Sequence, residues 1–147
     1  MNASQNKPLW TCPKCGAKFV TKNMWHSCGR WTVEKSLEGK SAKAKQFFNA
    51  FLELARKCGP YELAPAKTGV ALMVRVRFAG VKAVSEGGMT CTFWLKQKIS
   101  SPRFARVDLI PPDNWIYTFR VTSLEQLDDE VLGWLCLARQ VGEQKGA

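Results

Sequence analysis

Hydrophobic residues recur at three- and four-residue steps in one stretch that follows Ser41. This period is typical of a helix with one buried side. Ser41 can cap the start of such a helix, and Gly59 with Pro60 can end it. The apolar positions of the stretch are Ala44, Phe47, Phe48, Phe51, Leu54, Ala55 and Cys58.

A second stretch with the helical period follows Ser123 near the end of the chain. Gln126 lies three positions after Ser123, as in a capping box, and acidic residues occupy the first turns, where they favour the helix dipole. We expect the closing helix to begin here. Its apolar stripe consists of Leu124, Leu127, Val131, Trp134, Leu135 and Ala138.

Between these stretches, from Tyr61 to Val121, apolar and polar residues alternate. The alternation predicts about five antiparallel strands. Because a helix precedes the strands and another follows them, we expect an α+β domain over residues 41–143, with both helices on one face of the sheet. The polar segment from Thr32 to Lys40 has no clear period and is interpreted as a connector. Breaks between strands are expected at residues 79–80, 86–88, 100–102 and 111–114.

The alternation also assigns each strand residue to a face, with Val70 to Phe78 taken as one strand. One face of the predicted sheet is apolar. The other is basic and includes one tryptophan, and it is the candidate surface for nucleic acid or another anion. Its members are Arg75, Arg77, Trp94, Lys96, Lys98, Arg106 and Arg120.

Residues 9–31 follow neither period and contain four residues of metal-ligand type. Two residues separate Cys12 from Cys15 in Cys-Pro-Lys-Cys-Gly, and His26 and Cys28 come shortly after them. Three cysteines and one histidine suit tetrahedral Zn²⁺ and leave no coordination position open for a substrate. We therefore predict a structural zinc knuckle. A redox Cys-x-x-Cys pair and an iron site share this spacing, but the sequence around the pair is not typical of either.

The remaining cysteines, Cys58, Cys91 and Cys136, each lie in the apolar phase of a different predicted element. We expect all three to be separate core residues. With two further cysteines in a metal-type pair, a reducing compartment, the cytoplasm, is expected. The apolar stretches are shorter than the roughly 20 residues that a membrane helix needs, and Met1 to Pro8 does not have the pattern of a signal peptide.

The formal net charge is +10, and it is unevenly distributed along the chain. Residues 1–45 hold nine basic and two acidic residues, 46–120 hold eleven and five, and 121–147 hold two and five. An anionic partner would explain this excess. The alternative is that the charge serves solubility and that the lysines and arginines simply cover a solvated sheet face.

No catalytic residue is nominated, because the sequence has no glycine-rich phosphate loop and its only histidine is a predicted zinc ligand. The first functional hypothesis is a zinc-containing, non-enzymatic module that binds nucleic acid or another polyanion. The second is a small-ligand or protein-interaction module in which Pro111 to Trp115 helps to form a pocket. An enzyme that uses carboxylates stays open as a third class.

The chain resembles a bacterial family of unknown function, domain-of-unknown-function family 5655. The resemblance runs from WTCPKCG and WHSCG through VRVRFAGV, FWLKQKI, SPRF and LDDEVLGWL. It implies the same zinc ligands and no catalytic residue. The expected layout is also similar to the helix, five strands and helix of YdhG-like and YjbR-like proteins, which resemble frataxin in shape and are sometimes called DNA-binding.

Overall fold

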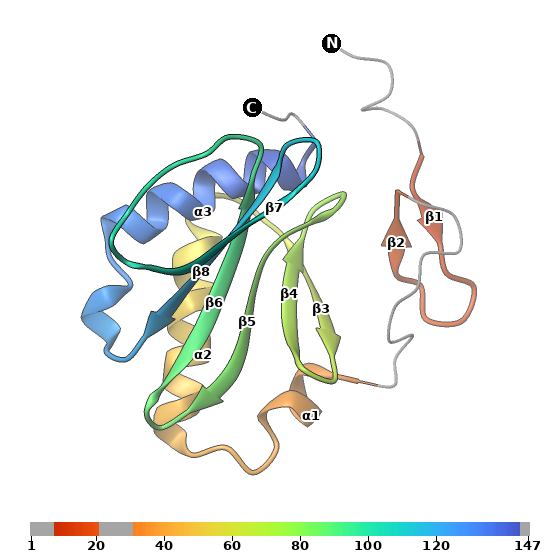
Figure 1. The fold of residues 1–147 in the computed structure, drawn as a ribbon. Coiled ribbons are helices and arrows are strands. Elements are labelled where there is room, and N and C mark those ends of the chain that lie inside the picture. The colour runs from red at the N-terminus through yellow and green to blue at the C-terminus, as the bar shows by residue number, and fades with distance from the viewer. Residues whose placement is uncertain (1–7, 21–30, 145–147) are drawn as a thin grey trace.

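A six-stranded antiparallel sheet forms the body of the protein, as the computed structural model in Figure 1 shows. The structure describes residues 8–20 and 31–144. The strand order is β3-β4-β5-β6-β8-β7. The α+β class is confirmed, with one strand more than expected. The strands are β3 (Glu62–Ala66), β4 (Gly69–Met73), β5 (Arg77–Ser85), β6 (Gly88–Leu95), β7 (Phe104–Ile110) and β8 (Asn114–Val121).

Helix α2 (Ala42–Arg56) is the first of the two predicted helices. The hydroxyl of Ser41 accepts a hydrogen bond from the amide of Ala44 at 3.1 Å, which confirms the expected cap. The helix ends before Gly59, whose φ of +136° is in the region that favours glycine. A Cβ at this position would lie 2.7 Å from the guanidinium carbon of Arg139, so the end of the helix also depends on a close approach of α3.

Helix α3 (Asp129–Gly142) begins later than the capping box at Ser123 predicts. The Gln126 side chain does accept from the amide of Ser123, at 3.3 Å. This box opens only a short 3-10 turn (Leu124–Gln126). Asp128 caps α3 itself, by accepting from the amide of Val131 at 3.2 Å. A second cap a few residues after the first therefore starts the helix.

The predicted single strand from Val70 to Phe78 is wrong, because the chain bends at residues 74–76 and returns antiparallel to itself. The amides of Arg75 and Val76 both donate to the carbonyl of Gly142, at 2.9 and 3.1 Å. The end of α3 thus holds a bend that contains neither glycine nor proline. The expected break at residues 79–80 is also wrong, since both residues lie within β5.

A short helix, α1 (Val33–Leu37), lies where a connector was expected. Thr32 caps it by accepting from the amide of Lys35 at 3.1 Å. Val33 and Leu37 pack against the core. One helical turn and a half is too short to show a period, which is why the pattern did not reveal it.

The core lies between α2, α3 and the sheet face that they cover, which we call the covered face (Figure 1). An aromatic cluster forms its centre. The ring of Phe93 is stacked 5.0 Å from that of Tyr117 and 5.4 Å from that of Trp134, centroid to centroid. The Tyr117 hydroxyl accepts from the amide of Ile99 at 2.7 Å and donates to the carbonyl of Gln97 at 2.9 Å, so its polar atom is satisfied.

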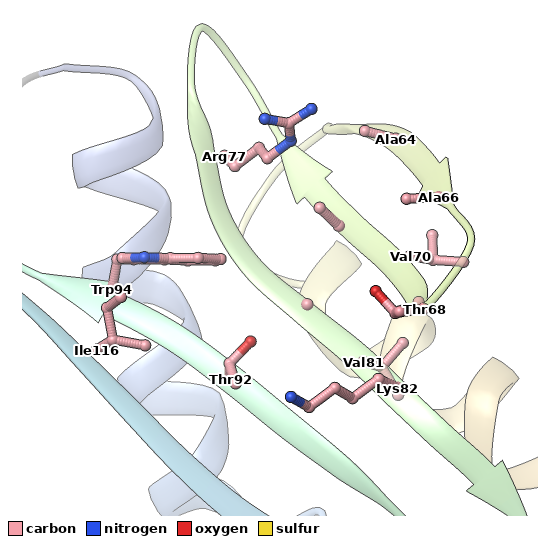
Figure 2. Close-up of a pocket in the computed structure, with 13 residues that line it drawn as sticks. Ala64, Ala66, Thr68, Val70, Arg77, Val81, Lys82, Thr92, Trp94 and Ile116 are labelled. Atoms are coloured by element: carbon pink, nitrogen blue, oxygen red, sulfur yellow. The ribbon is translucent and has the colours of Figure 1, made fainter. Parts of the chain in front are cut away.

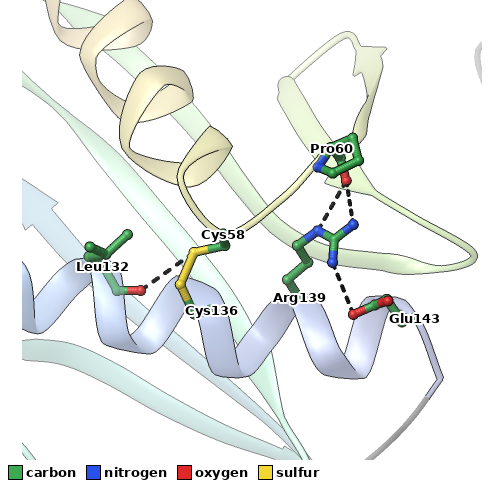
Figure 3. Close-up of a disulfide and its surroundings, with 6 residues drawn as sticks. All are labelled: Cys58, Pro60, Leu132, Cys136, Arg139 and Glu143. Atoms are coloured by element: carbon green, nitrogen blue, oxygen red, sulfur yellow. Dashed lines mark hydrogen bonds and ion pairs between the residues drawn. A yellow bond between two sulfur atoms is a disulfide. The ribbon is translucent and has the colours of Figure 1, made fainter.

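Cys58 and Cys136 form a disulfide between the end of α2 and the middle of α3, as Figure 3 shows. The expectation that both are separate core cysteines is therefore wrong. Their Cα atoms are 5.0 Å apart, although 78 positions separate them in sequence. Helical period placed both on core-facing sides, but it carries no information about which residues of two packed helices meet. Cys91 is fully buried, as expected.

Candidate functional site

The face of the sheet opposite the helices, which we call the open face, has a floor of small residues. Strand register places Ala64, Ala71, Gly80 and Thr92 side by side on β3 to β6, and Thr118 continues the row on β8. Side chains of this size leave space above the backbone. The result is a hollow of about 360 Å³ that these strands line, drawn in Figure 2; we call it the central hollow.

One wall of the central hollow is formed by Trp94 and Ile116, which are paired across β6 and β8. The indole ring extends from β6 toward β5 (Figure 2). Gly80 has no side chain to fill the floor of the hollow. A Cβ at this position would be crowded, 3.3 Å from the hydroxyl oxygen of Thr92 and 3.4 Å from the carbonyl of Val70. A flat ring could therefore lie on the floor and against the tryptophan.

Two cations of β5, Arg77 and Lys82, also line the central hollow. Arg77 belongs to the predicted basic face. Lys82 does not, because the expected break at residues 79–80 stopped the alternation before it reached that position. Since β5 continues through Gly80, Lys82 lies on the same face two residues later, and following the alternation across the glycine would have found it.

A second hollow, of about 410 Å³, adjoins the first, because Arg77 and Trp94 line both. We call it the end hollow, since Gln144 at the end of α3 forms part of it. Lys96 lines it as well, and its ammonium group is held by Asn114 and by Asp113 at 3.5 Å. Among the residues that the structure describes, no carboxylate lines either hollow.

Arg106 and Arg120 lie on the open face, as expected, but they line neither hollow. Arg106 is bound to Asp108, with Nε and Oδ2 2.8 Å apart. Arg120 donates to the hydroxyl of Thr90 at 3.0 Å. Both guanidinium groups are thus partly engaged at the β7 and β8 side of the sheet.

Arg75 and Lys98, by contrast, are not part of the open face. Arg75 lies in the bend at residues 74–76 and donates from Nε to the side chain of Gln144 at 2.9 Å. Lys98 follows the end of β6, and its ammonium nitrogen is 5.5 Å from the centroid of Trp115, which belongs to the covered face. Alternation fails at both positions because neither is inside a strand.

The first two predicted zinc ligands lie in a hairpin formed by β1 (Trp10–Thr11) and β2 (Lys18–Phe19). The amide of Cys12 donates to the carbonyl of Ala17 at 2.8 Å, and that of Gly16 donates to the carbonyl of Cys12 at 2.9 Å. Gly16 has a φ of +78°, which explains why glycine follows the second cysteine. Cys12 is 5% exposed and Cys15 is exposed.

His26 and Cys28, the other two predicted ligands, lie outside the described residues. Within the described ranges, no three residues of the types His, Cys, Asp and Glu gather as a metal site, but only half of the predicted set belongs to those ranges. The hairpin is near the open face at one point, where the guanidinium carbon of Arg77 is 6.0 Å from the centroid of the Phe19 ring.

Cys91 is the described thiol in the middle of the sheet, on the covered face. Burial raises the pKa of this thiol far above its usual value, and the positive charge of Arg120 lowers it only slightly in comparison. The group therefore stays protonated at neutral pH, which is unfavourable for a nucleophile.

Among the described residues, none of the helices has the length and apolar content that crossing a bilayer requires. No curated protein and no solved structure matches the chain. Residues 33–140, which begin after the cysteine-containing hairpin and include α2, the six strands and most of α3, match a family described as a domain of unknown function, DUF5655. The chain belongs to this family.

Proposed function

We propose that the protein is a non-enzymatic binding module whose open face holds single-stranded nucleic acid. The observation that carries this proposal is that two adjoining hollows meet at one tryptophan, Trp94, and one arginine, Arg77. Lys82 and Lys96 each line one of these hollows. In this arrangement a base stacks on the indole ring while neighbouring phosphates contact the cations.

The small side chains on the floor of the central hollow favour single-stranded over double-stranded nucleic acid as the ligand. Ala71 and Gly80 let a base approach the backbone of the sheet, and Trp94 offers its ring at the side. A base inside a duplex is stacked on its neighbours on both sides and is not free to reach that ring. The net charge of +10 adds a long-range attraction for any polyanion, which salt weakens.

A fluorescence titration with a labelled single strand, at about 50 mM and about 200 mM salt, tests the proposal. Trp94→Ala should weaken binding by roughly 5- to 150-fold, the effect of losing one stacked base. Arg77→Gln should also weaken it. Arg106→Gln is the matched control, because Arg106 is an exposed arginine of the same face that lines neither hollow.

Equal losses in the Arg77 and Arg106 variants would indicate a diffuse charge effect and contradict the proposed site. Affinity that does not change with salt would contradict a polyanion as the ligand. Absence of binding at the lower salt concentration would leave the lysines and arginines as the cover of a solvated face.

A small anionic ligand with an aromatic ring is the second candidate, and the volume of the central hollow favours it. About 360 Å³ is within the range of small-molecule sites, roughly 300–1,000 Å³. The two candidates differ in how affinity depends on length. A strand-binding face binds longer oligonucleotides more tightly than a mononucleotide, whereas a small-ligand site binds both with about the same affinity.

We also propose that Cys12, Cys15, His26 and Cys28 hold one structural Zn²⁺, which supports the N-terminal segment. The buried Cys12 and the turn at Gly16 support this assignment. A cytoplasmic location would keep the three thiols reduced, and the Cys58–Cys136 disulfide is the observation against that location.

Cys12→Ser or Cys28→Ser should remove the metal and loosen residues 9–31, while the helix and sheet body stays folded. Lys14→Gln is the control, because it changes the same turn without removing a ligand. Metal content by mass spectrometry and the far-ultraviolet circular dichroism of the body are the measurements. Unchanged metal content in either cysteine variant would show that the ligand set is wrong.

A further inference from the structure

We propose a second site, beside the central hollow, in which three lysines bind a phosphoryl group. A hollow of about 250 Å³ lies beside the β3–β4 turn, where α1 and α2 approach β4 and β5. We call it the lysine hollow, because Lys40, Lys67 and Lys82 line it. Neither Lys40 nor Lys67 belongs to the strand positions that the sequence pattern marked as a basic face.

The three ammonium groups come from separate parts of the chain and have no described acidic partner. Lys40 follows α1, Lys67 is in the β3–β4 turn, and Lys82 is on β5. All three residues are exposed, and none forms an ion pair with a carboxylate of the described residues. No described carboxylate lines the hollow either. In Figure 2 the Lys82 side chain extends from β5 toward Thr92, and rotation of this exposed side chain is the movement that brings its ammonium group to the other two. Cations around one space repel each other, and a dianion between them would offset that repulsion.

Ser36, at the end of α1, provides an independent observation at the same hollow. Its hydroxyl oxygen is buried and has no hydrogen-bond partner within the described part of the chain. A buried hydroxyl without a partner is destabilising. An anion bound in the lysine hollow would give the Ser36 hydroxyl an acceptor. Rotation about χ1 to another staggered position is the movement that would let it donate to an anion.

The backbone around the hollow is held in a strained form. Ala83 has a φ of +54°, which is unusual for a residue with a Cβ, at an irregularity in the register of β5 and β6. This irregularity leaves Ala83 at the hollow and places Val84 in the core. Gly69 on β4 is paired with Lys82 on β5, and a Cβ at Gly69 would be 2.6 Å from the carbonyl of Val81. The wall next to Lys82 is therefore fixed by the fold rather than by the side chains alone.

The ligand class follows from the charge and the walls. Three ammonium groups and a hydroxyl suit a phosphoryl dianion. Phe48 and Leu37 line the other side, so the group attached to the phosphate can be apolar. Two sources have this chemistry: a free phosphate or phosphomonoester, and the terminal phosphate of a nucleic acid strand. Because Lys82 lines both the lysine hollow and the central hollow, the second source remains within reach of the open face.

Titration with inorganic phosphate at constant ionic strength, followed by amide chemical shifts, tests the site. We expect saturable shifts at Ser36, Lys67 and Thr68. The double variant Lys40→Gln/Lys67→Gln should weaken binding by about tenfold or more, since it removes two of the three charges. Lys57→Gln is the matched control: an exposed lysine at the opposite end of α2, about 20 Å along the helix from Lys40.

Ser36→Ala gives a second readout that does not depend on removing charge. Without phosphate it should not lower the thermal midpoint, because the lost hydroxyl has no partner, and with phosphate it should reduce the stabilisation that the ligand confers. Comparison of a 5′-phosphorylated strand with the same strand bearing a 5′-hydroxyl identifies the source. If the double variant loses affinity only for the phosphorylated strand, the ligand of the lysine hollow is the end of a strand. If it loses affinity for inorganic phosphate, the ligand is a free phosphate or phosphomonoester.

The proposal is overturned if phosphate shifts are absent or unsaturable, or if the double variant and Lys57→Gln bind phosphate equally. Phosphate binding at the lysine hollow can be tested whether or not the open face binds nucleic acid. Fluorescence changes that require Trp94 report the open face, and they should persist in Lys40→Gln/Lys67→Gln when the strand carries a 5′-hydroxyl.

Discussion

The two faces of the sheet are made from alternating residues of the same strands, yet they differ in nearly every property. Along β6, Cys91 and Phe93 point to the covered face and are fully buried, while Thr92 and Trp94 point to the open face and are half-buried. The helices explain the burial of the first pair. On the open face the strands instead carry small side chains beside a single large ring, an arrangement that favours binding rather than packing.

This difference separates stability from function within one element. The covered face contributes apolar burial and ring stacking, so changes there should act on folding. The open face has hollows where a core would have side chains, so changes there should act on ligands. Variants at neighbouring positions of one strand can test this division directly.

The largest effect is expected for Phe93→Ala. Its ring stacks on Tyr117 and Trp134, and its removal should lower the free energy of unfolding by about 4 kcal/mol. Thr92→Ala, one position away on the open face, should change that free energy by less than about 1 kcal/mol. Chemical denaturation of both variants is the measurement, and similar losses would contradict the division between the faces.

The next largest effect concerns the two helices on the covered face. Replacing Cys58 and Cys136 together with alanine should lower the free energy of unfolding by about 3 kcal/mol, because the disulfide closes a long loop. Reductant should shift the denaturation midpoint of the parent protein and leave that of the double variant unchanged. An intact mass that corresponds to six reduced thiols in the parent protein would show that the disulfide does not form and would contradict this prediction.

A smaller effect, on binding alone, is expected for Ala71→Leu. A leucine side chain at this position fills part of the central hollow, and it should weaken ligand binding by about tenfold, or about 1.4 kcal/mol. The free energy of unfolding should change by less than that, because Ala71 is half-buried on the open face. If Ala71→Leu lowers the free energy of unfolding and leaves ligand affinity unchanged, Ala71 contributes to packing rather than to binding.

The smallest effect is expected at the start of α3, where Asp128 is the cap. Partial burial alone would raise the pKa of its carboxyl group, but the hydrogen bonds from Arg103 and from the amide of Val131 lower it overall. The ionised form therefore contributes stability above the unfolded pKa, near 4, and this contribution is lost as pH falls through the lower folded value.

Asp128→Asn should remove this pH-dependent part, by less than about 1 kcal/mol since the side chain is 45% exposed. Thermal midpoints measured between pH 7 and acid conditions give the result. We expect the two curves to converge at low pH, and parallel curves would show that Asp128 is not the group that titrates.

Most of the fold could be predicted from the sequence because its elements are long and regular. Helix α2 shows its period over several turns, and the alternation in β6 and β8 assigns their faces correctly. Predictions failed where an element is short or where the chain bends without glycine or proline. The bend at residues 74–76 is held by the end of α3, so no local pattern marks it.

The candidate site could be predicted only in part for the same reason. Trp94 is in β6, Arg77 begins β5 and Lys96 directly follows the end of β6, and the alternation placed all three on one face. Arg75 and Lys98 lie outside the strands, and Lys82 lies beyond a glycine that was taken for a break. Charge and period together indicate which residues share a face, but not which of them line the same hollow.

The sequence by itself determined the α+β class, the buried face of each long element and the excess of positive charge, because these depend on residue type and local spacing. Only the tertiary structure decided the Cys58–Cys136 pairing, the two hollows that meet at Trp94 and Arg77, and the gathering of Lys40, Lys67 and Lys82. Each of these features joins segments that are distant along the chain. Their contact depends on strand order and helix packing, which act over the whole domain and leave no mark at any single position.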